Sequence, residues 1–188
     1  SDISTMFQDT AGTIPVTAVD QLVARVNDLS GNGNHLIQST SDSRPILKKD
    51  SKGYYLLFDG TNDFFQTSGT VNLSGLSLFT AFASLSKERS AAEIIFETST
   101  NYNNNLGAML LNFDTNKLAV ATRGTGLYPD GFTFGEAATT TGGVFTTQAN
   151  LAAVSNKITT FRKDGVSPTI TASLDNTSQT LTDQTLYV

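Results

Sequence analysis

The stretch that decides the fold is Asp28-Leu-Ser-Gly-Asn-Gly-Asn-His35, followed by Arg44-Pro45 and by Phe58-Asp-Gly-Thr-Asn-Asp63. The glycines at positions 31 and 33 permit backbone conformations with positive φ. The Asp, Ser and Asn side chains between them can accept hydrogen bonds from nearby main-chain amides and so close short turns. Because the residue before a proline avoids the α region, Arg44 restarts an extended segment. The stretch therefore predicts a compact loop whose polar groups satisfy one another, set between short strands.

Outward from this loop, the chain reads as many short strands separated by turn clusters. Residues 18–27 carry apolar side chains at helical spacing, but their length and β-branched residues favour a strand, with a helix as the alternative. Thr and Phe are frequent and charged residues are sparse, which suits pleated, half-buried surfaces. The expected strands are 16–17, 22–26, 54–58, 64–65, 76–85, 91–96, 106–113, 117–123, 151–154, 157–163, 169–174 and 185–188.

Two hairpins are predicted in the second half of the chain. The alternating segment 109–113 turns through Asp114-Thr-Asn116 into the alternating segment 117–122. The segment 158–163 runs into Asp164-Gly165, a dipeptide that favours the positive φ angles of a tight hairpin turn. Both segments should therefore pair with strands that neighbour them in sequence.

The charge and composition of the chain exclude several function classes. The formal net charge is −5 and no block of Lys or Arg occurs, which disfavours binding to nucleic acid or to an anionic membrane surface. No apolar run approaches the roughly 20 residues of a membrane-spanning helix, so we expect no membrane insertion. The absence of Cys excludes disulfides, iron–sulfur clusters and thiol catalysis. A length of 188 residues fits one domain.

The motifs D-x-S-G-N-G-N-x, R-P and F-D-G-x-x-D, in this order and spacing, resemble laminin-G-like domains of the concanavalin A-like lectin/glucanase superfamily, above all those of bacteriophage structural proteins. The lead-in from Met6 to Thr17 and the hairpin from Phe161 to Gly165 are similar as well. The resemblance implies an all-β fold, a two-sheet antiparallel jelly-roll sandwich spanning residues 1–188. Val26 stands where many relatives carry Trp, so one core anchor of the family is replaced.

The C-terminal end departs from the family pattern. The last residues, Leu186-Tyr-Val188, read as the interior of a strand, whereas relatives continue through one or two further strands. We therefore expect a sandwich that lacks its last strand or strands, and a chain that is a segment of a larger protein.

The superfamily includes glucanases, so the acidic residues require a test against hydrolase chemistry. Those enzymes place E-x-D-x-x-E on one strand, and the nearest match here is Glu93-Ile-Ile-Phe-Glu97, with Ile95 at the centre. Four residues along a strand separate the two Glu by about 13 Å. Glycosidases hold their two carboxylates roughly 5–10 Å apart. We expect two solvent-facing acids and no enzyme.

A serine hydrolase site is also disfavoured. His35 is the only histidine, and Ser30 and Asp28 lie near it in the sequence. No Ser lies in a nucleophile elbow, and closeness in sequence is not the geometry of a triad. His35 is expected to be a hydrogen-bonding residue of a surface loop.

Calcium is the one cofactor that the resemblance brings into question. Laminin-G-like sandwiches often hold one calcium ion at a loop rim through Asp and carbonyl oxygens. Here Asp59 and Asp63, with the carbonyls of Gly60 and Asn62, can supply such ligands. The favoured interpretation is an ordinary Asp-Gly turn in which Asp63 accepts hydrogen bonds from loop amides, so we expect no cofactor, with calcium as the alternative.

A sugar-binding loop is the second candidate site. Lectins recognise hydroxyl groups with Asn and Asp and stack sugar faces on aromatic rings. The alternative is a polar hairpin loop, and the lack of Trp removes the strongest stacking side chain. The candidate residues are Asn101, Tyr102, Asn103, Asn104, Asn105 and Tyr128.

Three function classes follow from the resemblance. The first is a non-enzymatic structural or interaction module of a phage virion, a head decoration or a tail or fibre display domain, contacting other virion proteins or copies of itself. The alternative is a carbohydrate-binding module for host surface glycans. A glycan hydrolase is the third class and is disfavoured by the missing catalytic pattern. The expected location is the virion, or the bacterial cytoplasm during assembly.

Overall fold

The computed structural model describes residues 2–86, 93–101, 109–114, 117–122, 130–137, 143–152, 158–167, 170–171 and 180–188. In this part of the chain the regular structure is β, apart from two single-turn 3-10 helices, η1 (Ile3–Thr5) and η2 (Ser41–Ser43). Every pairing between its strands is antiparallel, and none of its sheets closes into a barrel. The predicted all-β, antiparallel class is confirmed, and the segment 18–27 forms a strand at Arg25–Val26 and no helix.

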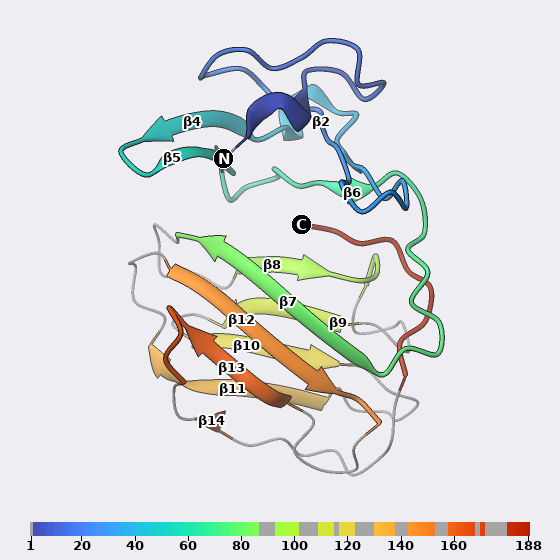
Figure 1. Cartoon of the computed structure of the whole chain (residues 1–188), viewed down its shortest axis with the longest axis vertical. Coiled ribbons are helices and arrows are strands. Elements are labelled where there is room, and N and C mark those ends of the chain that lie inside the picture. Colours follow the sequence, from blue (N-terminus) through green and yellow to red (C-terminus); the bar gives the residue numbers. More distant parts are fainter. Residues whose placement is uncertain are drawn as a thin grey trace. The chain divides into compact units, whose positions relative to one another are not determined.

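The chain divides into two compact units, Ser1–Val71 with Thr185–Val188, and Asn72–Gln184 (Figure 1). The first unit contains a four-stranded sheet in the order β1-β2-β3-β6 and the separate hairpin β4-β5. The expected single domain stays a prediction. The strands of this unit are β1 (Met6–Phe7), β2 (Arg25–Val26), β3 (Leu36–Ile37), β4 (Ile46–Asp50), β5 (Gly53–Leu57) and β6 (Gln66–Thr67).

The last residues of the chain extend the first unit's sheet beyond β6. Phe65 and Val188 exchange two main-chain hydrogen bonds of 2.8 and 2.9 Å. The Thr67 amide donates to the Leu186 carbonyl at 2.8 Å, and the Thr67 hydroxyl accepts a bond from the Leu186 amide at 3.1 Å. Strand pairing therefore joins the C-terminal segment 185–188 to the rest of the first unit.

The core of the first unit is a cluster of Met6, Val16, Val23, Leu47 and Phe65. Phe58 meets Phe65 edge to face, with ring centroids 6.0 Å apart, the arrangement that aromatic quadrupoles favour.

Arg44 closes the loops around this core. Its guanidinium donates to the carbonyls of Gln8, Gln38 and Ser39 at 3.0–3.3 Å. The Arg-Pro pair of the sequence thus joins separate loops of the first unit.

The second unit contains a five-stranded sheet in the order β14-β11-β10-β9-β8 and a three-stranded sheet in the order β13-β12-β7. Figure 1 shows them as two layers, with the three-stranded sheet nearer the viewer. The strands are β7 (Leu78–Leu85), β8 (Glu93–Glu97), β9 (Met109–Asp114), β10 (Lys117–Thr122), β11 (Asp130–Ala137), β12 (Gly143–Asn150), β13 (Ile158–Lys163) and β14 (Ile170–Thr171).

The strands of the first predicted hairpin pair with each other. The turn of the second is present, but the next strand, β14, pairs with β11 and not with β13. Strands β9 and β10 pair in register from Lys117 opposite Asp114 to Thr122 opposite Met109. After β13, Asp164 and Gly165 have φ angles of 51° and 82°, and Lys163 and Val166 exchange two hydrogen bonds of 2.9 Å. The positive φ angles at both central positions are the reason that the Asp-Gly pair marks this turn.

The strand expected at 151–154 is wrong over residues 151–152, and residues 153–154 lie outside the described ranges. The strand is β12, which ends at Asn150, and residues 151–152 form a turn in which the Asn150 side chain accepts a bond from the Ala152 amide. Strand β12 carries Val144, Thr146 and Gln148 on one face, and it buries Phe145, Thr147 and Ala149 on the other. Because both faces mix polar and apolar residues, the two-residue alternation is hidden in the sequence.

Replacing Thr147 with valine is expected to raise the free energy of unfolding by about 1–2 kcal/mol. The Thr147 side chain is 2% exposed, and its hydroxyl has no hydrogen-bond partner among the described residues. Valine has the same shape and removes the desolvated hydroxyl. Urea unfolding measures the change, with Thr146→Val on the opposite face of the same strand as the matched control. A loss of stability in Thr147→Val would contradict the buried, unpaired hydroxyl.

Candidate functional site

The three-stranded sheet of the second unit carries strongly exposed apolar side chains on one of its faces. Strand β7 alternates strictly between exposed and half-buried residues. Phe82 is 73% exposed and Leu78 is 68% exposed, and both point away from the buried side of the sheet. Contiguous exposed apolar patches, as opposed to single exposed residues, mark interaction surfaces, so the neighbours of these side chains matter.

The register between β7 and β12 places Val144 beside this aromatic ring. Phe82 lies opposite Thr146, and Val144 lies opposite Ser84, so Phe82 and Val144 are diagonal neighbours within reach of each other. Val144 is 49% exposed. The eight outward positions of the two strands carry no charge, and we call them the outer face: Leu78, Thr80, Phe82, Ser84, Val144, Thr146, Gln148 and Asn150.

The loop at 28–35 has the self-satisfied form that its sequence predicts. The Asp28 carboxylate accepts bonds from the Ser30 amide and hydroxyl, both at 2.8 Å, and from the Asn34 amide at 2.9 Å. Gly31 and Gly33 have φ angles of 85° and 76°. The polar residues of the motif therefore close the loop.

The same bonds show that Ser30, His35 and Asp28 are not arranged as a triad. The Ser30 hydroxyl donates to the Asp28 carboxylate, and His35 Nδ1 accepts a bond from the Asp28 main-chain amide at 3.1 Å. A triad needs the serine hydroxyl to donate to the imidazole. These groups are occupied in shaping the loop.

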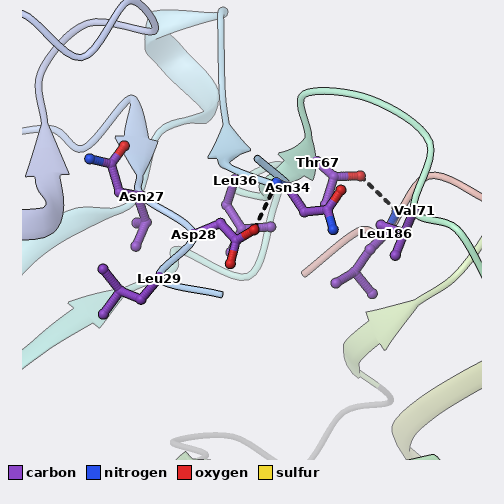
Figure 2. Close-up of a pocket in the computed structure, with 9 residues that line it drawn as sticks. Asn27, Asp28, Leu29, Asn34, Leu36, Thr67, Val71 and Leu186 are labelled. Carbon is purple, nitrogen blue, oxygen red and sulfur yellow. Dashed lines mark hydrogen bonds between the residues drawn. The ribbon is translucent and has the colours of Figure 1, made fainter. Parts of the chain in front are cut away.

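An open groove of about 410 Å³ lies beside this loop in the first unit (Figure 2). Its walls are mainly apolar and come from Val26, Leu36, Val71 and Leu186. Asn34 adds a carboxamide, and Figure 2 shows it between Asp28 and Thr67. Asn34 has no side-chain hydrogen bond among the described residues, so this amide can bind a polar group of a small ligand.

Asp59 and Asp63 are both used by the turn that they begin and end. One Asp59 oxygen accepts bonds from the amides of Thr61, Asn62 and Asp63 at 2.7–3.3 Å, and Asp63 accepts one from the Asp59 amide at 2.9 Å. Burial and then the nearby Asp59 charge raise the pKa of Asp63. The described residues contain no group of three or more His, Cys, Asp or Glu side chains able to hold a metal. Calcium binding stays a prediction.

Two aspartate substitutions are expected to change stability in opposite directions. The Ser30 hydroxyl, with the amides of Ser30 and Asn34, lowers the pKa of Asp28 below 3.8. Its ionised form therefore stabilises the fold above that value, and this stabilisation is lost as the pH falls through the lower folded pKa. Asp28→Asn should then lower the melting temperature at neutral pH and flatten the acid limb of the stability curve.

Asp63 is the matched case, because its pKa is raised above 3.8. Its charged form disfavours the fold above its folded pKa, and this cost is absent below 3.8. Asp63→Asn should raise the melting temperature at neutral pH and leave it unchanged in acid. Thermal melts from acid to neutral pH measure both variants. Changes in melting temperature of the same sign and size in the two variants would contradict the opposite pKa shifts of Asp28 and Asp63.

The two acids considered for hydrolase chemistry lie on opposite faces of β8. Glu93 pairs with position 113 of β9 and Glu97 with position 110, and the register shifts between Ile94 and Phe96. Because the partner positions are an odd number apart, the bulge turns Glu97 to the face opposite Glu93. The two acids were expected to face solvent, but both are half-buried, and the bulge places them on different faces of the strand.

Of the sugar-binding candidates, the structure describes Asn101. Asn101 is exposed and follows β8. Tyr102, Asn103, Asn104, Asn105 and Tyr128 lie outside the described residues. Sequence reasoning did not single out Phe82, because Phe79 and Phe82 place an aromatic residue on each face of β7, and the pattern alone does not say which face is covered.

No protein-family model, no curated protein and no solved structure matches the chain. Within the described ranges there is no helix with the length and apolar character needed to cross a bilayer. The outer face, the groove and the sequence motifs are therefore the features of the chain that bear on its function.

Proposed function

We propose that this chain is a non-enzymatic structural and interaction module of a bacteriophage virion, a laminin-G-like jelly-roll domain displayed on a head, tail or fibre. The antiparallel sheets in two layers of the second unit are compatible with such a sandwich. The motifs at 28–35, 44–45 and 58–63 support the phage relationship. Its place is the assembled virion, and the bacterial cytoplasm before assembly.

The observation that carries this proposal is the outer face. Phe82 and Val144 form an apolar group on two paired strands. Polar side chains of β7 and β12 surround it, and the charged Arg162 and Asp164 lie beside it at β13 and the turn that follows. A rigid aromatic side chain surrounded by polar residues is typical of the centre of a protein interface. The partners are other virion proteins or copies of the chain itself.

The experiment is to locate the chain in purified phage particles grown from the genome that encodes it. Antibodies against the recombinant chain are used for immunogold electron microscopy and for blots of gradient fractions. We expect labelled particles and co-sedimentation of the chain with them. A chain found solely in the soluble fraction would contradict the proposal.

Carbohydrate binding is the second candidate, and the groove beside Asn34 favours it. Apolar walls with the carboxamides of Asn27 and Asn34 suit the mixed polar and apolar surface of a sugar ring. A glycan array tests the wild-type chain, and Asn34→Ala and Asn101→Ala separate the groove from the loop predicted by sequence. Signal lost in Asn34→Ala alone assigns the groove, whereas no glycan above background removes this candidate.

A further inference from the structure

The loop at 28–35 contains Asn32-Gly33, the sole Asn-Gly pair in the sequence. An asparagine side chain can be attacked by the main-chain nitrogen of the next residue, and glycine hinders this attack least because it has no Cβ. Folded structure usually prevents the reaction by holding that amide in a hydrogen bond or by burying it. Whether Asn32 reacts therefore depends on whether the Gly33 amide is hydrogen-bonded or buried.

The structure leaves the Gly33 amide open. Asn32 and Gly33 are both exposed. The Gly33 N–H has no hydrogen-bond partner among the described residues, although the Gly33 carbonyl accepts a bond from the Ser68 hydroxyl at 3.2 Å. Nothing lies within 4 Å of the place where a Cβ of Gly33 would be, so no neighbouring group crowds Gly33 on that side.

The Asn32 side chain is held back against its own loop. Its Nδ2 donates to Ser30 Oγ at 3.0 Å, and the Ser30 hydroxyl donates to the Asp28 carboxylate. The bond to Ser30 thus keeps the exposed carboxamide close to its own loop. Reactive carbonyl carbon and open amide nitrogen belong to adjacent residues of one exposed turn.

We propose that Asn32 is a site of spontaneous deamidation in the folded protein. Solvent removes the proton from the Gly33 nitrogen, which forms a bond to Asn32 Cγ. Nδ2 takes up a proton and leaves as ammonia, which gives a cyclic succinimide. Water then opens the ring at either carbonyl, yielding aspartate or isoaspartate at position 32. The net reaction consumes one water and releases one ammonia, and no oxidant or enzyme is needed.

The product changes the loop that lines the groove. The Asn32 Nδ2 bond to Ser30 is lost, and a new negative charge appears near the Asp28 carboxylate. The isoaspartate form also adds one methylene to the main chain inside the loop that Asp28 and Asn34 close. The modification therefore acts on the groove as the protein ages, whatever ligand or partner the chain has.

The test is to incubate the full folded chain at physiological temperature and mildly alkaline pH and to follow the tryptic peptide 26–48 by mass spectrometry. This peptide is obtained because trypsin does not cleave Arg44-Pro45, and it contains Asn27 and Asn34 as internal references. We expect the amide-to-acid mass change at Asn32 several times faster than at Asn27 or Asn34, with separate peaks for aspartate and isoaspartate.

A comparison with the isolated peptide tests the role of the fold. The folded chain should react at a rate within a few-fold of the free peptide 26–48, because the Gly33 amide is open in both. Asn32→Gln should abolish the new peaks, and Asn34→Ser should leave them unchanged. A folded chain that is protected many-fold relative to the peptide, or that reacts equally at the three asparagines, overturns the proposal.

Discussion

Replacing Phe65 with alanine is expected to lower the free energy of unfolding by about 3–5 kcal/mol. Phe65 is 1% exposed in the core cluster of the first unit and meets Phe58 edge to face. Its main chain exchanges two hydrogen bonds with Val188. Loss of the ring leaves a cavity at the point where the C-terminal residues join the sheet, so both the core and the strand pairing are weakened.

The neighbouring Phe64 supplies the matched control. Phe64 is 37% exposed, and its ring lies 6.3 Å from that of Tyr187 in a tilted arrangement. Phe64→Ala should lower the free energy of unfolding by about 1 kcal/mol or less, since substitutions at the surface have small effects on stability. Urea unfolding followed by circular dichroism compares the two variants. Equal losses would mean that Phe65 is not the core residue of this segment.

The second large effect is expected from replacing Leu151 with alanine, which should lower the free energy of unfolding by about 2–5 kcal/mol. Leu151 is 1% exposed and follows β12, and its amide donates to the Ser77 carbonyl at 2.7 Å. That main-chain bond fixes the residue at the start of β7 and the end of β12. A shortened side chain at a fixed position cannot move to fill the space, so most of the cavity should remain.

Leu78 is the control for this second prediction. It is one residue beyond Ser77 and lies on the outer face, where alanine should change the unfolding free energy by no more than about 0.5 kcal/mol. The same urea experiment measures both variants. A Leu78→Ala loss as large as that of Leu151→Ala would show that the outer face is covered in the folded chain.

The loop at 28–35 was predictable because its structure is local. Asp28, Ser30 and Asn34 bond within a few residues of one another, and Gly31 and Gly33 supply the positive φ angles that the turn needs. The turn at Asp164-Gly165 was predictable for the same reason. Where neighbours in sequence satisfy one another, the residue types alone define the geometry.

The features that sequence reasoning missed depend on pairing between distant strands. The bulge near Ile95 turns Glu97 away from Glu93, and it exists only in the register of β8 on β9. The sequence placed this strand at 151–154 and not at β12, because both faces of β12 mix Thr with apolar residues. The exposure of Phe82 likewise depends on which side of β7 is covered. The bulge, the position of β12 and the exposure of Phe82 therefore could not be predicted from neighbouring residues alone.

The most direct measurement is the amount of chain bound to purified phage particles when Phe82 is replaced with threonine. Threonine keeps the strand propensity and removes the ring. If Phe82 lies at the centre of an interface, the substitution should weaken the binding free energy by about 2 kcal/mol, which is roughly 30-fold in affinity. Ile94→Thr is the control, an exposed apolar residue on β8 in the other sheet. We predict particles depleted of the Phe82→Thr chain and fully occupied by the Ile94→Thr chain. Equal occupancy by wild type and Phe82→Thr would contradict the outer face as the interaction surface.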